Sequence, residues 1–167
     1  MIKIGIIGPE STGKSTLAKA LAAHFGGTYV AEYARTYVEQ LARPYTYEDV
    51  EQIAQEQIRQ LQQPYDTEYV FFDTDLIITK VWFEYCYHHC PDYVTEALEH
   101  ENIDLYLVCL PDLPFEDDPV REHPHEREEL LKCYLKEIEA LHRPYALIGG
   151  RGEERTNAAV AAIGQLH

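Results

Sequence analysis

The sequence has little positive charge. Lys and Arg together number 14 in 167 residues, against 29 Asp and Glu, which gives a formal net charge of −15. Such a protein repels a nucleic-acid backbone and an anionic membrane surface, so we expect neither as a partner. An acidic protein that binds an anionic nucleotide must gather its few cations, or Mg²⁺, at the site. The basic residues therefore become the ones to follow.

The sequence also lacks a long apolar run, a cleavable leader pattern and a dense set of cysteines. No apolar stretch approaches the length that spans a bilayer, and the chain passes from Met1 directly into a strand-like segment. Four cysteines are too few for the disulfide framework of a small secreted domain. These absences predict reduced thiols and a cytoplasmic location. The length and the 46% hydrophobic content predict a single globular domain over residues 1–167.

Short apolar runs alternate with segments of helical periodicity. This alternation predicts an α/β fold in which a parallel sheet is covered by helices on both faces. The expected strands are residues 2–7, 28–31, 69–72, 105–110 and 145–148. The expected helices are residues 17–25, 33–41, 46–61, 76–84, 125–142 and 156–166. In such folds ligands bind at the carboxyl ends of the strands, and the polar features of this sequence fall there.

The loop after the first strand matches the phosphate-binding pattern G-x-x-x-x-G-K-[ST]. Its defining residues are Gly8, Gly13, Lys14 and Ser15, and a helical pattern follows directly. The glycines allow backbone N–H groups to surround a phosphate, Lys14 reaches the β- and γ-phosphates, and the Ser15 hydroxyl binds Mg²⁺. The alternative is a chance glycine turn, which the flanking strand and helix disfavour.

Acidic residues end the two neighbouring strands. Asp73 stands where a carboxylate would hold Mg²⁺ close to Ser15, while the alternative for Asp73 and Asp75 is to cap the next helix. Glu32, with Arg35 one turn later, could orient a substrate hydroxyl or accept its proton, or could simply form a surface ion pair. The sequence leaves open whether Glu32 or Asp73 is the proton acceptor.

A proline-broken segment at about residues 111–127 has the composition of a lid. Arg121, with Arg127 beyond it, could close over the transferring phosphoryl group, although a solvated arginine is the alternative. The Cys86–Cys90 segment lies in a helical pattern and has no second pair at zinc spacing, so a zinc site is not expected. Aromatic side chains that could form a flat wall for a substrate ring are Tyr33, Tyr37, Trp82 and Tyr85.

Four segments together resemble the ribosylnicotinamide kinase domain of NadR-type proteins. They are Gly-Pro-Glu-Ser-Thr-Gly-Lys-Ser-Thr at 8–16, Ala-Glu-Tyr-Ala-Arg-Thr-Tyr-Val at 31–38, Phe-Asp-Thr-Asp at 72–75 and Asp-Pro-Val-Arg at 118–121. The resemblance implies a three-layer P-loop kinase sandwich with a lid and a five-stranded parallel sheet of order 2-3-1-4-5. It also implies that MgATP phosphorylates the 5′-hydroxyl of nicotinamide riboside to give nicotinamide mononucleotide.

The resemblance implies a role for each matching residue. The expected ATP site comprises Gly8, Glu10, Ser11, Thr12, Gly13, Lys14, Ser15, Thr16 and Arg121, and by analogy with P-loop kinases Arg151 or Arg155 against adenine. The expected substrate side comprises Glu32, Tyr33, Arg35, Asp75 and Trp82, with Ser15 and Asp73 as metal ligands and Lys14, Glu32, Asp73 and Arg121 as catalytic residues.

The sequence also departs from full-length NadR-type proteins, because no adenylyltransferase or DNA-binding segment precedes Met1. The second step of NAD synthesis and a repressor role are therefore not expected. Two alternatives to a nicotinamide riboside kinase stay open. One is a kinase of another nucleoside or small hydroxyl acceptor, and the other is a regulatory P-loop ATPase or nucleotide switch. The oligomeric state and the choice between ATP and GTP are not predicted.

Overall fold

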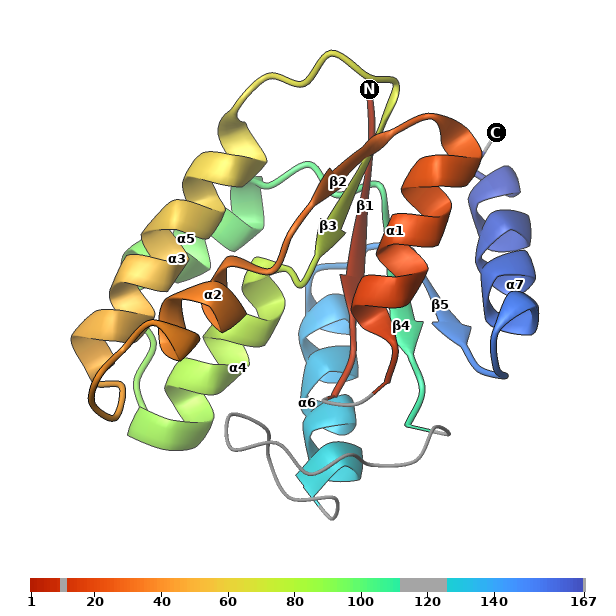
Figure 1. Cartoon of the computed structure of the whole chain (residues 1–167). Helices are drawn as coiled ribbons and strands as arrows, with labels where there is room; N and C mark the ends of the chain where they lie inside the picture. The colour runs from red at the N-terminus through yellow and green to blue at the C-terminus, as the bar shows by residue number, and fades with distance from the viewer. Residues whose placement is uncertain (10–11, 112–125, 167) are drawn as a thin grey trace.

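The computed structural model describes residues 1–9, 12–111 and 126–166 (Figure 1). Its centre is a five-stranded sheet in which every pairing is parallel and the strand order is β2-β3-β1-β4-β5. The strands are β1 (Ile2–Ile7), β2 (Thr28–Val30), β3 (Tyr69–Asp73), β4 (Leu105–Cys109) and β5 (Tyr145–Ile148). The predicted fold class and strand order are confirmed.

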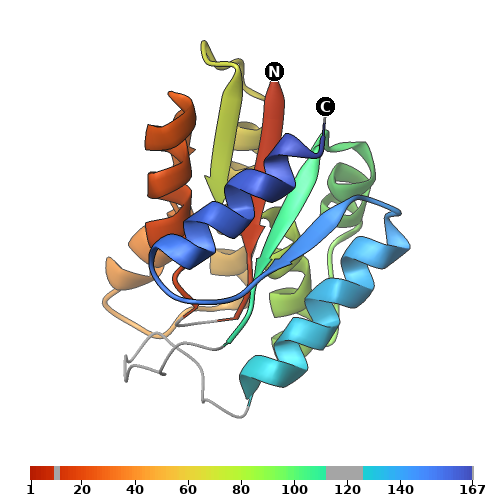
Figure 2. The ribbon, with the colours of Figure 1, turned by 90° about the vertical axis from the view of Figure 1, so that its right-hand side faces the viewer.

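Helices cover both faces of the sheet and form the outer layers of the sandwich. They are α1 (Lys14–Phe25), α2 (Tyr33–Glu39), α3 (Tyr47–Gln62), α4 (Leu76–Tyr87), α5 (Asp92–His100), α6 (Glu126–Ala140) and α7 (Glu153–Gly164). α1 and α7 share one face, where Leu17 and Leu21 of α1 belong to the same buried cluster as Ile163 of α7. Figure 2 shows α7 lying across this face beside β4 and β5.

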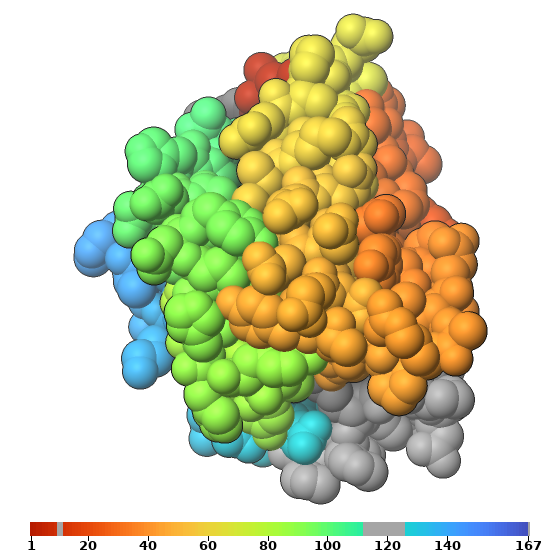
Figure 3. All heavy atoms as spheres, turned by 90° about the vertical axis from the view of Figure 1, so that its left-hand side faces the viewer, coloured from red at the N-terminus to blue at the C-terminus, as the bar shows by residue number. Residues whose placement is uncertain are grey.

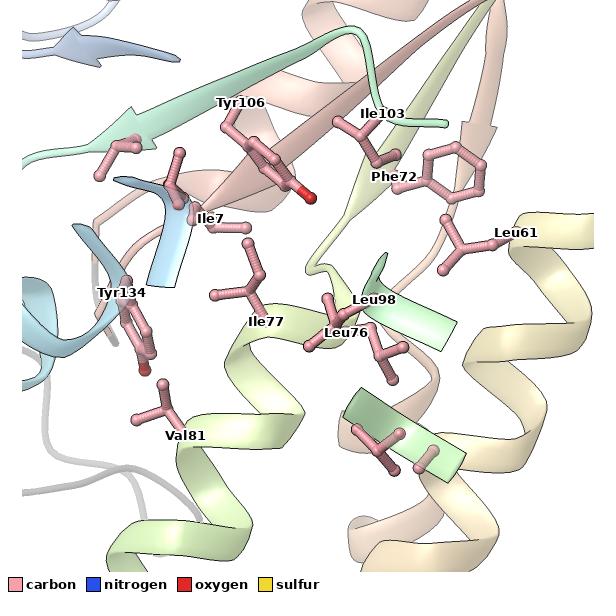
Figure 4. Close-up of a cluster of buried hydrophobic side chains, with 14 of the residues drawn as sticks. Ile7, Leu61, Phe72, Leu76, Ile77, Val81, Leu98, Ile103, Tyr106 and Tyr134 are labelled. Carbon is pink, nitrogen blue, oxygen red and sulfur yellow. The ribbon is translucent and has the colours of Figure 1, made fainter. Parts of the chain in front are cut away.

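The opposite face carries the larger core, under α3, α4, α5 and α6. Figure 4 shows Tyr106 of β4 and Ile7 of β1 pointing toward Ile77 of α4, with Tyr134 of α6 beside Val81. β-Branched and aromatic side chains fill the sheet side of this cluster, as suits strands buried on both faces. The outer surface of these helices is seen in Figure 3, where α3 and α4 lie side by side.

The helix limits differ from the sequence predictions by a few residues, as is usual at frayed ends. α2 ends at Glu39 rather than residue 41, and α7 begins at Glu153 rather than residue 156. The sequence pattern did not predict α5, although Val94 and Leu98 have helical spacing and are both buried. Within the described ranges, no helix combines the length and the apolar character needed to cross a bilayer.

Because the strands are parallel, their carboxyl ends meet at one edge of the sheet. β1 pairs with β3 so that Ile6 lies opposite Asp73, and with β4 so that Ile7 lies opposite Val108. Gly8, which follows β1, is therefore flanked by the ends of both neighbouring strands. This edge holds the residues described next.

Candidate active site

Glycines shape both described ends of the loop between β1 and α1. Gly8 has φ +149°, and a side chain at this position would meet the carbonyl oxygen of Cys109 at 2.7 Å. Gly13 is the N-cap of α1 in the left-handed region, at φ 76°. The Thr12 hydroxyl donates to the Pro9 carbonyl oxygen at 2.7 Å. Glu10 and Ser11 lie outside the described residues.

Lys14 begins α1 and its side chain folds back over the loop. Its Nζ donates to the carbonyl oxygens of Gly8 at 2.9 Å and Pro9 at 3.1 Å, and the residue is only 9% exposed. The ammonium group is thus held beside the start of the helix, where the dipole also favours an anion. This arrangement suits a phosphate-binding loop. Thr16, two positions after Lys14 in α1, is exposed.

Asp73, the last residue of β3, is joined to the loop by a short hydrogen bond. The Ser15 hydroxyl donates to Asp73 Oδ2 at 2.5 Å, and the Tyr29 hydroxyl from β2 donates to the same oxygen at 2.9 Å. Asp73 is 2% exposed, and its Oδ1 is buried with no hydrogen-bond partner among the described residues. A buried carboxylate oxygen in this state needs a ligand, because its desolvation is otherwise uncompensated.

Ser15 and Asp73 fit the magnesium site that the phosphate-binding loop implies. Mg²⁺ prefers oxygen ligands, and the site offers the Ser15 hydroxyl and the unpartnered Oδ1 of Asp73. Across residues 1–9, 12–111 and 126–166, no group of three or more His, Cys, Asp and Glu side chains could hold a metal ion. An Mg²⁺ ion held here would thus also need oxygens from nucleotide phosphates or water, which is how this ion is commonly bound.

Tyr29 is a site residue that the sequence analysis missed. Burial, and then the neighbouring charge of Asp73, raises the pKa of the Tyr29 hydroxyl to about 12. The hydroxyl therefore stays protonated at neutral pH and acts as a donor to Asp73. A tyrosine in a short edge strand gives no sequence signal of this role. Its position one residue before the end of β2, which pairs with β3, is the only clue.

A cavity of about 760 Å³ opens beside this cluster, under α2, α4 and α6. Three of the five residues predicted on the substrate side line it, namely Glu32, Arg35 and Trp82, and Thr74 links it to the end of β3. The rest of its wall is formed by Ala34, Val38, Arg43, Pro44, Tyr45, Ile78, Thr79, Tyr85, Cys86, Tyr87, Leu130 and Tyr134. The cavity is therefore lined mainly by apolar and aromatic side chains, with a few charged groups among them.

The charged groups of the cavity are paired with one another or with nearby acids. Arg35 lies 3.3 Å from Glu39 and 4.0 Å from Glu32. Arg43 donates to both carboxylate oxygens of Asp49, at 2.7 and 3.1 Å. Among the described lining residues, these contacts leave no strong excess of positive charge. A doubly charged phosphate would have to compete for the arginines with carboxylates that already hold them.

Two of the predicted substrate residues lie elsewhere. Tyr33 does not line the cavity, and its ring lies 5.9 Å from that of Tyr37. Asp75 is 2% exposed and caps α4, accepting from the backbone N–H of Ile77 at 3.3 Å. Burial raises the pKa of Asp75, and burial followed by the charge of Asp75 raises that of Glu101 well above its usual value. The alternative role of Asp75 as a helix cap is therefore the one realised.

The arginines that were predicted at the ATP site and in the lid lie in different environments. Arg155 is 4% exposed and its guanidinium is directed at backbone carbonyl groups, including that of Thr12 at 2.6 Å. Arg151 is exposed in the loop before α7. Arg121 and the central part of the expected lid, residues 112–125, lie outside the described residues. Arg127 is buried at the start of α6.

A family model for an AAA domain matches residues 3–155, which is most of the chain and includes the phosphate-binding loop. The chain belongs to this AAA domain family. No curated protein matched its sequence significantly.

Similar solved structures place this AAA-domain chain among P-loop kinase folds. It superposes on a crystal structure of NadR protein in complex with NR with a TM-score of 0.80 and 26% sequence identity, covering 99% of this chain and 50% of that one. A second NadR structure, in complex with NAD and AMP-PNP, gives 0.77 and 26%, covering 99% and 49%. The chain thus spans about half the length of the NadR chains.

More distant matches have the same fold over their whole length. Thymidylate kinase from Ehrlichia chaffeensis gives a TM-score of 0.69 at 11% identity, covering 99% of this chain and 98% of that one. Deoxyadenosine kinase from M. mycoides, with dCMP and dCDP bound, gives 0.65 at 16% identity and covers 98% of each chain. At such identities the likeness concerns the fold. A P-loop kinase fold implies that the chain binds ATP.

Proposed function

We propose that this chain is an ATP-dependent kinase that phosphorylates the 5′-hydroxyl of nicotinamide riboside to give nicotinamide mononucleotide. The observation that carries the proposal is that a phosphate-binding site and a cavity for an acceptor lie next to each other at one edge of the sheet. Lys14, Ser15 and Asp73 form the phosphate side, and the aromatic-lined cavity with Glu32 begins at the ends of β2 and β3. An acceptor in that cavity would have its hydroxyl beside the γ-phosphate of a nucleotide on the loop.

The lining of the cavity supports a nicotinamide riboside acceptor in particular. The pyridinium ring of this molecule is cationic, and aromatic faces such as those of Trp82 and Tyr45 attract cations. Arg35 and Arg43, the two arginines among the described lining residues, are already bound to carboxylates, which disfavours an acceptor that carries a phosphate. The likeness to NadR in complex with NR, at 26% identity, points the same way.

The hydrogen bonds of Asp73 support separate roles for the two acidic residues. Asp73 Oδ2 already accepts from Ser15 and Tyr29, so Asp73 serves the metal side and Glu32, which lines the cavity, accepts or orients the acceptor proton. Ser15 and Asp73 would hold Mg²⁺, which supplies charge neutralisation of the phosphates. Lys14 stabilises the charge on the transferring group, and positioning of the two substrates supplies much of the rate.

The assignment of Glu32 is tested by Glu32→Gln, with Glu56→Gln on α3 as a matched control that pairs with Arg59 away from the cavity. We expect Glu32→Gln to lower acceptor-dependent kcat by about 10²- to 10⁴-fold while ATP affinity is unchanged. Neither Glu56 nor its partner Arg59 is among the residues that line the cavity, so Glu56→Gln should retain kcat. Equal kcat values for wild type and Glu32→Gln would show that Glu32 is not the proton acceptor.

A further inference from the structure

Arg155 lies buried behind the phosphate-binding loop, with its guanidinium directed at main-chain oxygens. Nη1 donates to the Thr12 carbonyl at 2.6 Å, Nη2 to the Leu110 carbonyl at 3.3 Å and Nε to the Gly150 carbonyl at 3.4 Å. The side chain enters from the first turn of α7 and is 4% exposed. Arg155 is therefore a buried residue of the protein interior and not a surface arginine.

The three carbonyl groups belong to three different segments at the same sheet edge. Thr12 is in the phosphate-binding loop, Leu110 follows β4, and Gly150 is in the loop between β5 and α7. An arginine can join three such segments because its planar fork presents five N–H donors in fixed directions. A lysine has a single ammonium point charge and cannot span the same three acceptors. Leu110 directly follows Cys109, the last residue of β4, and the Cys109 carbonyl oxygen lies close to Gly8. Arg155 therefore contacts the end of β4 next to the point where β4 meets the phosphate-binding loop.

The bond to Thr12 also fixes the direction of a backbone N–H group. In a planar trans peptide the C=O and the following N–H point in opposite directions. Holding the Thr12 carbonyl against Arg155 therefore directs the Gly13 N–H away from Arg155. A phosphate-binding loop works by directing backbone N–H groups at its ligand. The orientation of this peptide is thus a functional property, because a reversed peptide would present an oxygen to the phosphate.

We infer that Arg155 is a positioning residue that holds the Thr12–Gly13 peptide of the phosphate-binding loop in its anion-binding orientation before nucleotide arrives. This role differs from contact with adenine, which the sequence analysis expected of Arg151 or Arg155. The inference rests on the nucleotide-binding half of the proposed function and does not depend on the acceptor. It predicts that Arg155 contributes to the affinity for phosphate groups and not to the choice of base.

The test compares Arg155→Lys and Arg155→Met with wild type and with the control Arg143→Lys. Arg143 is likewise a largely buried arginine, 13% exposed, which bonds to Glu101 and the Leu98 carbonyl and is not in contact with the loop. Dissociation constants for MgADP, MgGDP and adenosine are measured by calorimetry at a temperature where each variant is folded. The rate of hydrogen exchange at the Gly13 amide is measured in parallel. A loss of global stability alone would raise this rate in Arg143→Lys as well, so the control separates a global effect from a local one.

We expect Arg155→Lys to weaken MgADP and MgGDP binding by the same factor, about tenfold or more, and to leave adenosine binding unchanged. Exchange at Gly13 should become faster than in Arg143→Lys. A changed ADP-to-GDP preference would show that Arg155 reads the base and would overturn the inference. Unchanged affinities would overturn it too, because the three bonds would then only stabilise the fold. If Arg155→Met does not fold, Arg155→Lys alone decides. Failure of wild type to bind MgADP would instead refute nucleotide binding itself.

Discussion

At the scale of single residues, the hydrogen bond from the Tyr29 hydroxyl orients the Asp73 carboxylate. It donates to Oδ2 together with Ser15, which leaves Oδ1 as the carboxylate oxygen available to a metal ion or its water. The pKa of Tyr29 is raised to about 12, so its contribution to stability is complete below pH 10 and is lost only as the pH rises through 12. Across the physiological range Tyr29 is therefore a constant donor.

Tyr29→Phe removes this donor and keeps the ring. We expect the Mg²⁺ concentration needed for half-saturation to rise about fivefold, because hydrogen bonds to a charged group contribute about 1.5–3 kcal/mol and Ser15 still holds part of the geometry. Calorimetric titration of Mg²⁺ into the protein with a non-hydrolysable ATP analogue measures the change. Nucleotide affinity in the absence of metal should not differ from wild type.

Tyr65→Phe is the matched control, because its hydroxyl donates to the Gln60 carbonyl away from the site. It should leave the Mg²⁺ titration unchanged. Identical titration curves for Tyr29→Phe and wild type would mean that Tyr29 does not orient Asp73.

At the scale of elements, the start of α3 holds the loop that forms one wall of the cavity. Asp49 accepts from the Thr46 backbone N–H at 2.7 Å, from the Tyr37 hydroxyl at 2.9 Å and from Arg43 at 2.7 Å. The loop between α2 and α3 carries Tyr45, which packs edge-on against Trp82 with ring centres 5.0 Å apart. One carboxylate therefore links α2, α3 and the aromatic wall.

Asp49→Ala should loosen this wall without touching the phosphate-binding loop. We expect the KM for the acceptor to rise about tenfold, in keeping with the loss of a charge-assisted network, while the KM for ATP is unchanged. Glu56→Ala is the control, since Glu56 pairs with Arg59 on the exposed side of the same helix. Parallel changes in the KM of ATP and acceptor would contradict a local role.

The lowered pKa of Asp49 predicts that the stability of the protein falls at acidic pH. Hydrogen bonds, above all the one from Arg43 and then those from Thr46 and Tyr37, outweigh burial and lower the pKa of Asp49. A lowered carboxyl pKa contributes stability above the unfolded value, about 3.9, and loses it as the pH falls toward the folded value. The thermal midpoint of wild type should therefore drop more steeply than that of Asp49→Ala between about pH 4 and pH 2.

Several of these elements could be predicted from the sequence because their signals are local. The pair Thr46 and Asp49 has the spacing of a capping box, and the box is present at the start of α3. The contacts of Asp49 with Arg43 and Tyr37 could not be predicted, because they depend on how the intervening loop folds back. The sequence offered both a substrate role and a helix cap for Asp75, and only the structure shows that its buried carboxylate caps α4.

At the scale of the whole molecule, the parallel sheet brings residues far apart in the sequence to one edge. Glu32, Asp73 and the loop from Gly8 to Ser15 meet there because β2, β3 and β1 are neighbours. Alternation of strands and helices predicts the parallel sheet, whereas the order 2-3-1-4-5 came from the resemblance to NadR-type kinases. The interior position of Arg155 follows from the packing of α7 against α1, which no local pattern encodes.

The measurement that tests the central claim most directly is acceptor-dependent phosphoryl transfer by the full chain. The protein is incubated with Mg²⁺, ATP and either nicotinamide riboside, thymidine, deoxyadenosine, thymidylate or no acceptor, and products are identified by mass spectrometry. We expect nicotinamide mononucleotide and ADP in equal amounts, with Lys14→Ala reducing the rate by at least about a hundredfold. Preferred phosphorylation of another acceptor would contradict the proposed substrate. An equal rate of ATP consumption with and without every acceptor would contradict the kinase itself and favour a regulatory ATPase.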